Sequence, residues 1–311
     1  MRTYDKDPRC WLAELADLER DPMPDRVREN LETLRATVEW ARSYLAQPHP
    51  ELGRSGPVCP FVRPAMAKGT MFLTVWPGAE LDAEEVESVV RSYRDWFLEL
   101  EPAEGREAQY KSINILFPDI PASEVGRLID GTQERLKPVY VRDGIMIGEF
   151  HPGPPRKAGL WNPDFRPLKS PIPLLSIRHM VATDFAFLRD RREFMEAYLS
   201  AFADKVPSAL SDHVYDTALR FGLLPEGDEA ESAASHDEKA RAVRDAHALA
   251  RAVAEAARTL AGAETAGAGA QPAVPVAPPP GKVPAVHIAP VDEAAPAGMA
   301  EGAPALAGED A

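Results

Sequence analysis

The sequence predicts an α+β fold: one domain with a mixed β-sheet flanked by helices, followed by a C-terminal helix and a disordered tail. Its 311 residues are 45% hydrophobic, which is enough apolar material for a core. Helical and strand-like patterns follow each other irregularly, so hairpin and crossover connections are mixed. Beyond Leu260 the chain is rich in Pro and Gly and has no Phe, Trp or Tyr, which predicts disorder.

Composition and charge divide the chain into four parts. We expect an α+β body over residues 1–224, an acidic linker over 225–238, an Ala-rich helix over 239–261 and a disordered tail over 262–311. The helix carries an apolar stripe at three- and four-residue steps, formed by Val243, Ala246, Ala250, Val253, Ala257 and Leu260. This stripe fits either a helix that lies on the body or a homodimer contact.

The first part of the body is predicted to be helical. Apolar residues at 11, 12, 15 and 18 indicate a short helix, and a longer one begins near Pro24 and continues to Leu45. Residues 62–68 form a helical turn that Gly69 ends. The β-branched and aromatic residues of 70–76 then predict a strand.

The rest of the body alternates strands and helices. Asp82 and Glu85 form a capping box for a helix that reaches Leu100. We then expect a strand over 110–117, a helix over 122–136, a hairpin of strands 139–141 and 145–150 around Arg142-Asp143-Gly144, a strand over 173–181, and helices over 190–204 and 208–221.

Charge and composition exclude several functions. The net charge of −14 argues against a general nucleic-acid binder, which needs a basic surface. Two cysteines, Cys10 and Cys59, cannot form a disulfide framework. The first residues lack the apolar segment of a signal peptide, and no run is long enough to span a membrane. We therefore expect a cytoplasmic protein that binds neither nucleic acid nor membrane.

Two proline-punctuated segments, 52–69 and 150–173, are the candidate site, because long irregular loops in a compact domain are often functional. Residues 151–192 hold eight Lys and Arg against three Asp, which is unusual in an acidic chain. The second segment therefore predicts a pocket for an anion: a carboxylate, a phosphate or haem propionates. The alternative is that some of these cations are the solvated face of a helix.

Cys59 and His151 are the candidate catalytic residues. Cys59 precedes the predicted helical turn and has Arg54, Arg63 and Lys68 nearby, which favours a thiolate that acts as nucleophile, redox group or iron ligand. The alternative is a small buried apolar residue. His151 ends a strand at the mouth of the second segment, where a ligand or an acid–base group would lie. No nucleotide-binding or hydrolase motif accompanies them.

The residues of these segments resemble a known family. GRSGPVCPFVRPAMAKGTMFLTV, HPGP and WNPDFRPLKSPIPLLSIRHMV resemble a bacterial family described only as a domain of unknown function, over roughly residues 20–220. That resemblance implies an occurrence beside biosynthetic genes and no established activity. A second similarity is to the YqcI/YcgG-type proteins, some of which are haem-dependent N-oxygenases acting on guanidine groups. It rests on Cys59, Pro60, Ala65 and Gly69, although the order here is Cys-Pro where that family has Pro-Cys.

Three functions follow as hypotheses. The first is a haem-dependent oxygenase-like enzyme acting on a small amine or amino-acid-like metabolite, with Cys59 or His151 as ligand of a haem b iron. The residues that would bind the haem or substrate are Arg54, Arg63, Trp161, Phe165, Arg166, Lys169, Arg178 and His179. The second is a non-catalytic metabolite-binding or scaffold protein of a biosynthetic cluster. The third is a transferase that uses Cys59 as nucleophile.

Overall fold

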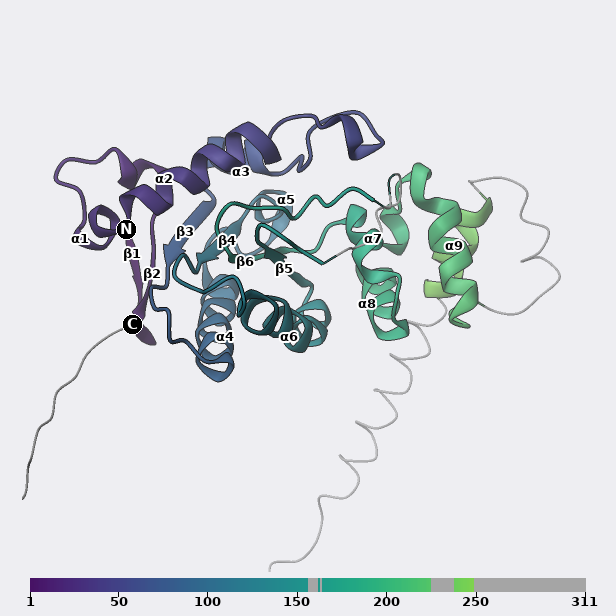
Figure 1. Ribbon diagram of the computed structural model, residues 1–311. Coiled ribbons are helices and arrows are strands. Elements are labelled where there is room, and N and C mark those ends of the chain that lie inside the picture. The colour runs from purple at the N-terminus through teal and green to yellow at the C-terminus, as the bar shows by residue number, and fades with distance from the viewer. Residues whose placement is uncertain (156–161, 163, 225–237, 249–311) are drawn as a thin grey trace, which may run out of the picture. The chain divides into compact units, whose positions relative to one another are not determined.

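The computed structural model describes residues 1–155, 162, 164–224 and 238–248. Its centre is a four-stranded mixed sheet (Figure 1). The strand order is β3-β4-β6-β5, and the bounds are Met71–Val75, Ser112–Leu116, Leu174–His179 and Ile145–Phe150 in that order. β3 and β4 are parallel, whereas β6 pairs antiparallel with both β4 and β5. The mixed sheet and the surrounding helices confirm the predicted α+β class.

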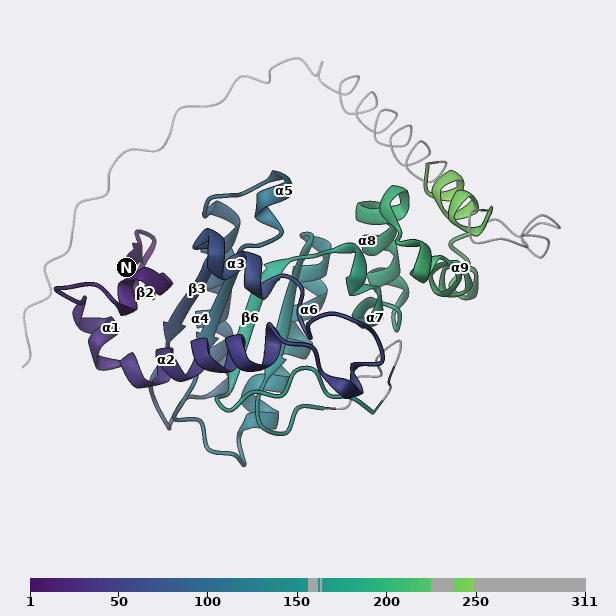
Figure 2. The ribbon, with the colours of Figure 1, turned by 90° about the horizontal axis from the view of Figure 1, so that it is seen from above.

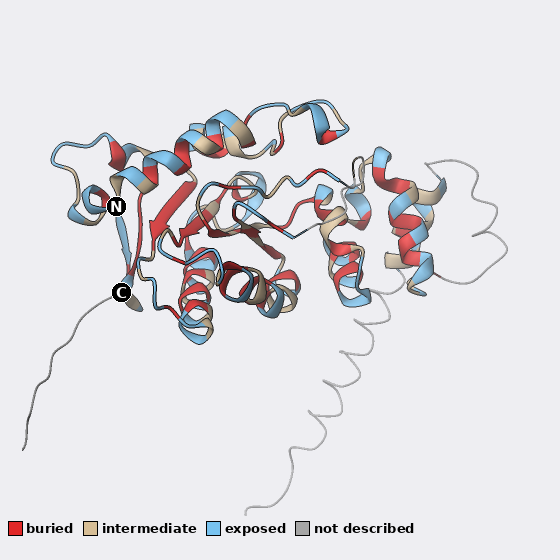
Figure 3. Ribbon diagram, in the orientation of Figure 1, coloured by how far each residue is buried: buried red, intermediate tan, exposed pale blue. Residues whose placement is uncertain are grey.

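Helices cover both faces of the sheet (Figures 1 and 2). One face packs against α4 (Ala83–Glu99) and α6 (Gly131–Arg142), with Phe72, Ile113 and Ile177 in the core between them. The other face packs against α1 (Asp25–Glu29), α2 (Leu31–Trp40), a π-helical turn (Ala41–Leu45) and α3 (Val62–Lys68). The strands β3 and β4 between these layers are almost wholly buried (Figure 3).

A third cluster of helices lies at the β5 side of the sheet. It comprises α7 (Phe185–Leu188), α8 (Arg192–Phe202) and α9 (Ser211–Arg220), with residues 238–248 as a further helix. Val243 of that last helix is 1% exposed and belongs to the core of this cluster. The remainder of the predicted Ala-rich helix and the whole predicted tail lie outside the described residues.

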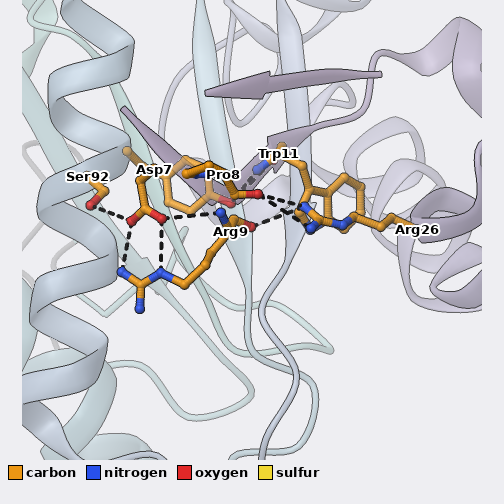
Figure 4. Close-up of polar contacts among 7 residues, drawn as sticks. Asp7, Pro8, Arg9, Trp11, Arg26 and Ser92 are labelled. Carbon is orange, nitrogen blue, oxygen red and sulfur yellow. Dashed lines mark hydrogen bonds and ion pairs between the residues drawn. The ribbon is translucent and has the colours of Figure 1, made fainter. Parts of the chain in front are cut away.

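The N-terminal segment begins with a β-hairpin, and the short helix predicted from residues 11, 12, 15 and 18 is present only as a 3-10 turn over Leu15–Leu18. β1 (Arg2–Tyr4) pairs antiparallel with β2 (Asp7–Leu12). The Asp7 carboxylate accepts hydrogen bonds from the Arg9 guanidinium (2.9 and 2.8 Å) and from the Ser92 hydroxyl of α4 (3.2 Å), and Arg26 of α1 donates to the Pro8 carbonyl (Figure 4). Side-chain contacts from two helices thus hold the hairpin, and Trp11 and Leu12, which were predicted to be helical, end its second strand.

A second correction concerns residues 139–141. They are predicted as a strand of a hairpin, but α6 continues through them to Arg142, and Gly144 (φ 72°) leads into β5. Tyr140 and Val141 are buried against neighbouring elements, so tertiary packing overrides the β preference of the valines. α5 (Gly105–Ala108) is a further short helix, before β4.

Within the described ranges, no helix combines the length and the apolar character that a bilayer crossing requires.

Candidate functional site

A cavity of about 470 Å³ opens on the sheet face that α2 and α3 cover. Its walls come from both proline-punctuated segments: Val58, Cys59, Pro60 and Phe61 from the first, and Phe165, Pro167 and Leu168 from the second. The two segments, distant in the sequence, therefore border one hollow. Its volume lies in the range of roughly 300 to 1,000 Å³ that small-molecule sites occupy.

Cys59 is placed at this wall by backbone contacts. The Cys59 amide donates to the Leu45 carbonyl (2.8 Å), and the Val58 amide donates to the Gln47 carbonyl (2.9 Å). These bonds tie the segment to the end of the π-helical turn. Cys59 is half-buried and lies three residues before α3, which has seven residues. The thiol thus reaches the cavity without belonging to a helix.

Arg178 lies in the same cavity on β6. Its guanidinium binds the buried Asp184 carboxylate through two hydrogen bonds, Nη1 to Oδ2 at 2.7 Å and Nη2 to Oδ1 at 2.6 Å. Burial lowers the pKa of Arg178, but the adjacent Asp184 carboxylate outweighs burial and raises it. Cys59 and Arg178 therefore border the same cavity.

The floor of the cavity is a polar row on the sheet. Strand register places Ser112 of β4 opposite Arg178 of β6, and Asn114 opposite Ser176. Gly148 of β5 is the next partner of Ser176. The Ser176 hydroxyl donates to Asn114 Oδ1 (2.9 Å). Polar side chains at a face covered by helices cost desolvation energy, so their gathering here marks a site rather than ordinary core.

Aromatic rings form one side wall. Trp40 and Phe150 pack edge to face with their ring centroids 5.7 Å apart, and Phe165 lies 4.7 Å from the ring of His49. Trp40, Phe150 and Phe165 border the cavity. Apolar atoms provide most of the surface that the lining exposes to the cavity, so the site suits a ligand with an apolar body.

The charged residues of the lining carry a formal surplus of positive charge. Arg54, Lys111, Lys137 and Arg178 are its described cations, and Glu149 and Asp184 its described acids. Burial lowers the pKa of Lys111 to about 8, and its ammonium donates to the Phe97 carbonyl (2.8 Å) and to the Leu100 carbonyl. The Lys111 ammonium is thus engaged on the α4 side of the sheet. The other described cations still exceed the described acids by one, which favours an anionic ligand.

His151 lies away from the cavity lining. Its Nε2 is 2.9 Å from Asp130 Oδ1, and its Nδ1 accepts a hydrogen bond from the Gly153 amide (3.3 Å). The side chain is 7% exposed. Both ring nitrogens therefore hold the start of the second segment in place.

The other predicted binding residues divide between the cavity and its surroundings. Arg54 and Phe165 border it. Arg63 donates to the Ala46 carbonyl (2.8 Å), and Arg166 donates to the Pro154 carbonyl (3.0 Å), so both guanidinium groups fix loops. Lys169 is exposed, although its carbonyl accepts a hydrogen bond from Trp40 Nε1 (3.1 Å). Trp161 lies outside the described residues.

His179 faces the opposite side of the sheet. Its ring centroid lies 4.8 Å from that of Phe97 of α4. Burial, with a smaller contribution from Lys111, lowers the pKa of His179 to about 4, so the imidazole is neutral at neutral pH. Alternation along β6 explains this, because Arg178 and His179 point to opposite faces.

Sequence reasoning missed the polar row and Lys111. A signal for the row is present in β4, where Ser112 and Asn114 alternate with the buried Ile113 and Ile115. In a strand covered on both faces, polar residues on one side indicate a site. Nothing in the sequence indicates that Lys111 is fully buried.

Residues 34–213 match a family model described as Domain of unknown function (DUF6875). The chain belongs to this family. All the described residues that line the cavity lie inside the matched range, whereas the N-terminal hairpin and residues 238–248 lie outside it. No curated protein and no solved structure matches the chain. The cavity is therefore a feature of the DUF6875 domain itself.

Proposed function

We propose that this cavity holds a b-type haem and that the protein is a haem-dependent oxygenase-like enzyme acting on a small amine or amino-acid-like metabolite. The supporting observation is that Cys59 and Arg178 line one largely apolar cavity. The second similarity noted above, to proteins that include haem-dependent N-oxygenases, agrees with this chemistry. When bound, the haem would supply an iron that activates oxygen.

The donor set of the cavity fits such a group. Cys59 offers one sulfur ligand, and Arg54 and Arg178 offer cations for propionates. Between the two candidate iron ligands, we choose Cys59, because both nitrogens of His151 are engaged with Asp130 and Gly153. Trp40, Phe150 and Phe165 would exclude water from the bound group.

An absorption spectrum after haem reconstitution tests the proposal. We expect a Soret band from the full-length protein, and a carbon monoxide complex with the red-shifted band that thiolate ligation gives. Cys59→Ala should lose the red-shifted band, and the matched control His151→Ala should keep it. A protein without a Soret band, or an unchanged spectrum in Cys59→Ala, would overturn the assignment.

A second candidate is a transferase with Cys59 as nucleophile. The placement of Cys59 and Arg178 at one cavity supports it, since sites with a nucleophilic cysteine commonly hold a cation. This function predicts stoichiometric alkylation of Cys59 by iodoacetamide near neutral pH in the native protein. Labelling that needs denaturation excludes it.

The remaining candidate is a non-catalytic metabolite-binding or scaffold protein of a biosynthetic cluster. The mostly apolar lining and the surplus of cations support it, because both suit the capture of an anionic metabolite. In this case Cys59→Ala leaves ligand binding intact, whereas substitution of Arg178 weakens it. A ligand that dissociates from the Cys59→Ala variant argues against this function.

A further inference from the structure

The polar row on the sheet has a defined hydrogen-bond direction. Asn114 Nδ2 donates to the Phe72 carbonyl (3.0 Å) and to Ser112 Oγ (3.3 Å). A backbone carbonyl only accepts, so the contact with Phe72 fixes which end of the Asn114 amide carries the hydrogens. Its oxygen in turn accepts from the Ser176 hydroxyl. The amide of Asn114 is thereby held in one orientation.

This orientation determines what Ser112 can do. Because Asn114 uses one N–H on Ser112 Oγ, the serine oxygen acts as an acceptor in that bond. Its own hydrogen remains available, and among the described residues it has no acceptor. Ser112 is half-buried and borders the cavity. The row therefore ends in a hydroxyl at the border of the cavity whose O–H can donate to a ligand.

Arg178 adds donors beside Ser112. The two residues are register partners of β4 and β6, so their Cβ atoms lie about 5 Å apart. Arg178 Nη1 donates hydrogen bonds to the Asp184 carboxylate and the His179 carbonyl, and Nη2 donates one to the Asp184 carboxylate. Of its five N–H groups, the Nε–H and one Nη2–H have no acceptor in the described part of the chain. Its side chain is 26% exposed and borders the cavity, from which we infer that these donors can reach a ligand there.

We propose that Ser112 and Arg178 form a carboxylate subsite, with Asn114 and Ser176 as positioning residues. Converging donors from a hydroxyl and a guanidinium match the acceptor-only oxygens of a carboxylate and reject an amine. The Arg178–Asp184 pair is neutral as a unit, and the remaining cations of the lining compensate a bound monoanion. The ligand class is a carboxylate with an apolar body that packs against the aromatic wall.

This inference rests on the proposed function only in that the cavity binds a ligand. The carboxylate belongs either to the metabolite or to a haem propionate, and these share one chemistry. The test uses the full-length protein without haem and three probes of equal chain length: octanoate, octanol and octylamine. Calorimetric titration should give octanoate the highest affinity and octylamine the lowest.

Variants locate the binding. Ser112→Ala removes one hydrogen bond to a charged group and should weaken octanoate binding about tenfold, with octanol unchanged. Ser112→Asp should reverse the preference, so that octylamine binds more tightly than octanoate. The exposed Ser43, whose hydroxyl donates to the Glu39 carbonyl, provides the control Ser43→Ala, which should bind as the native protein does. Equal affinity of native protein and both Ser112 variants for octanoate would overturn the subsite.

A competition experiment assigns the source of the carboxylate. If haem and octanoate exclude each other, the subsite takes a propionate; if both bind together, it takes the carboxylate of the metabolite. Either result supports the subsite, provided that Ser112→Asp abolishes the binding of octanoate. Octanoate binding that depends on Ser112 in a protein that binds no haem refutes the haem proposal alone. Haem binding that depends on Cys59, with octanoate binding indifferent to Ser112, refutes the subsite alone.

Discussion

Cys10 and Cys59 carry the same thiol in contrasting surroundings. Cys10 is fully buried in β2, and burial raises its pKa to about 12. Cys59 is half-buried at the cavity wall. The sequence indicated a candidate role for Cys59 from its proline and its basic neighbours. That Arg178, rather than Arg166, borders the same cavity as Cys59 depends on strand register, which residue types do not specify.

The Asp7 carboxylate stabilises the folded protein through its hydrogen bonds with Arg9. Its hydrogen bonds with Arg9 are the main cause that lowers its pKa to about 2. A folded pKa below the unfolded value of roughly 3.9 adds stability above about pH 4, and this contribution disappears as the pH falls through about 2.

We therefore predict that Asp7→Asn lowers the free energy of unfolding by about 1 kcal/mol at neutral pH. The difference from the native protein should vanish near pH 2. Urea unfolding across this pH range measures it, with the exposed Asp5→Asn as control. A difference that grows on acidification would contradict the pairing of Asp7.

At the level of elements, the sequence patterns predicted correctly those helices and strands that contacts between neighbouring residues stabilise. The strand over 70–76, the turn that Gly69 ends and the helix behind Asp82 agree with β3, α3 and α4. The hairpin of β1 and β2 was missed because its partners lie in other elements, such as Ser92 of α4. The end of α6 was missed because Pro138 and the valines favour a break that burial of Tyr140 overrides.

The cap of α4 gives a test at this scale. The Asp82 side chain accepts a hydrogen bond from the Glu85 amide (2.8 Å). Asp82→Ala should lower the free energy of unfolding by about 1 kcal/mol, because the first turn loses its cap. Chemical denaturation measures the change, and Glu80→Ala, an exposed acid outside the helix, is the control. Equal losses in the two variants would show that charge, not capping, is the cause.

At the level of the whole molecule, the described helix 238–248 is attached to the DUF6875 domain by its apolar side. Val243 packs into the core of the third helix cluster. Lys239 forms an ion pair with Asp212 of α9, with 3.3 Å between Nζ and Oδ1. The sequence predicted an apolar stripe here but left its partner open. The periodicity of apolar residues identifies which side of a helix is buried, but it does not identify the element against which that side packs.

Val243→Asp should therefore destabilise the domain by about 2 kcal/mol, since it loses a buried side chain and buries a charge. Ala248→Asp adds the same charge at an exposed position of the same helix and should have little effect. Thermal unfolding of both variants measures this. Equal melting temperatures would contradict the packing of this helix on the domain.

The central claim is that a sulfur and a guanidinium border one ligand-binding hollow. The most direct measurement is the rate at which iodoacetamide alkylates Cys59, followed by mass spectrometry, with and without saturating octanoate or haem. The buried Cys10 serves as the internal reference. Our account predicts that either ligand slows the alkylation of Cys59 strongly and that Ser112→Asp abolishes the protection by octanoate. Unchanged alkylation rates at saturation with both ligands would contradict it.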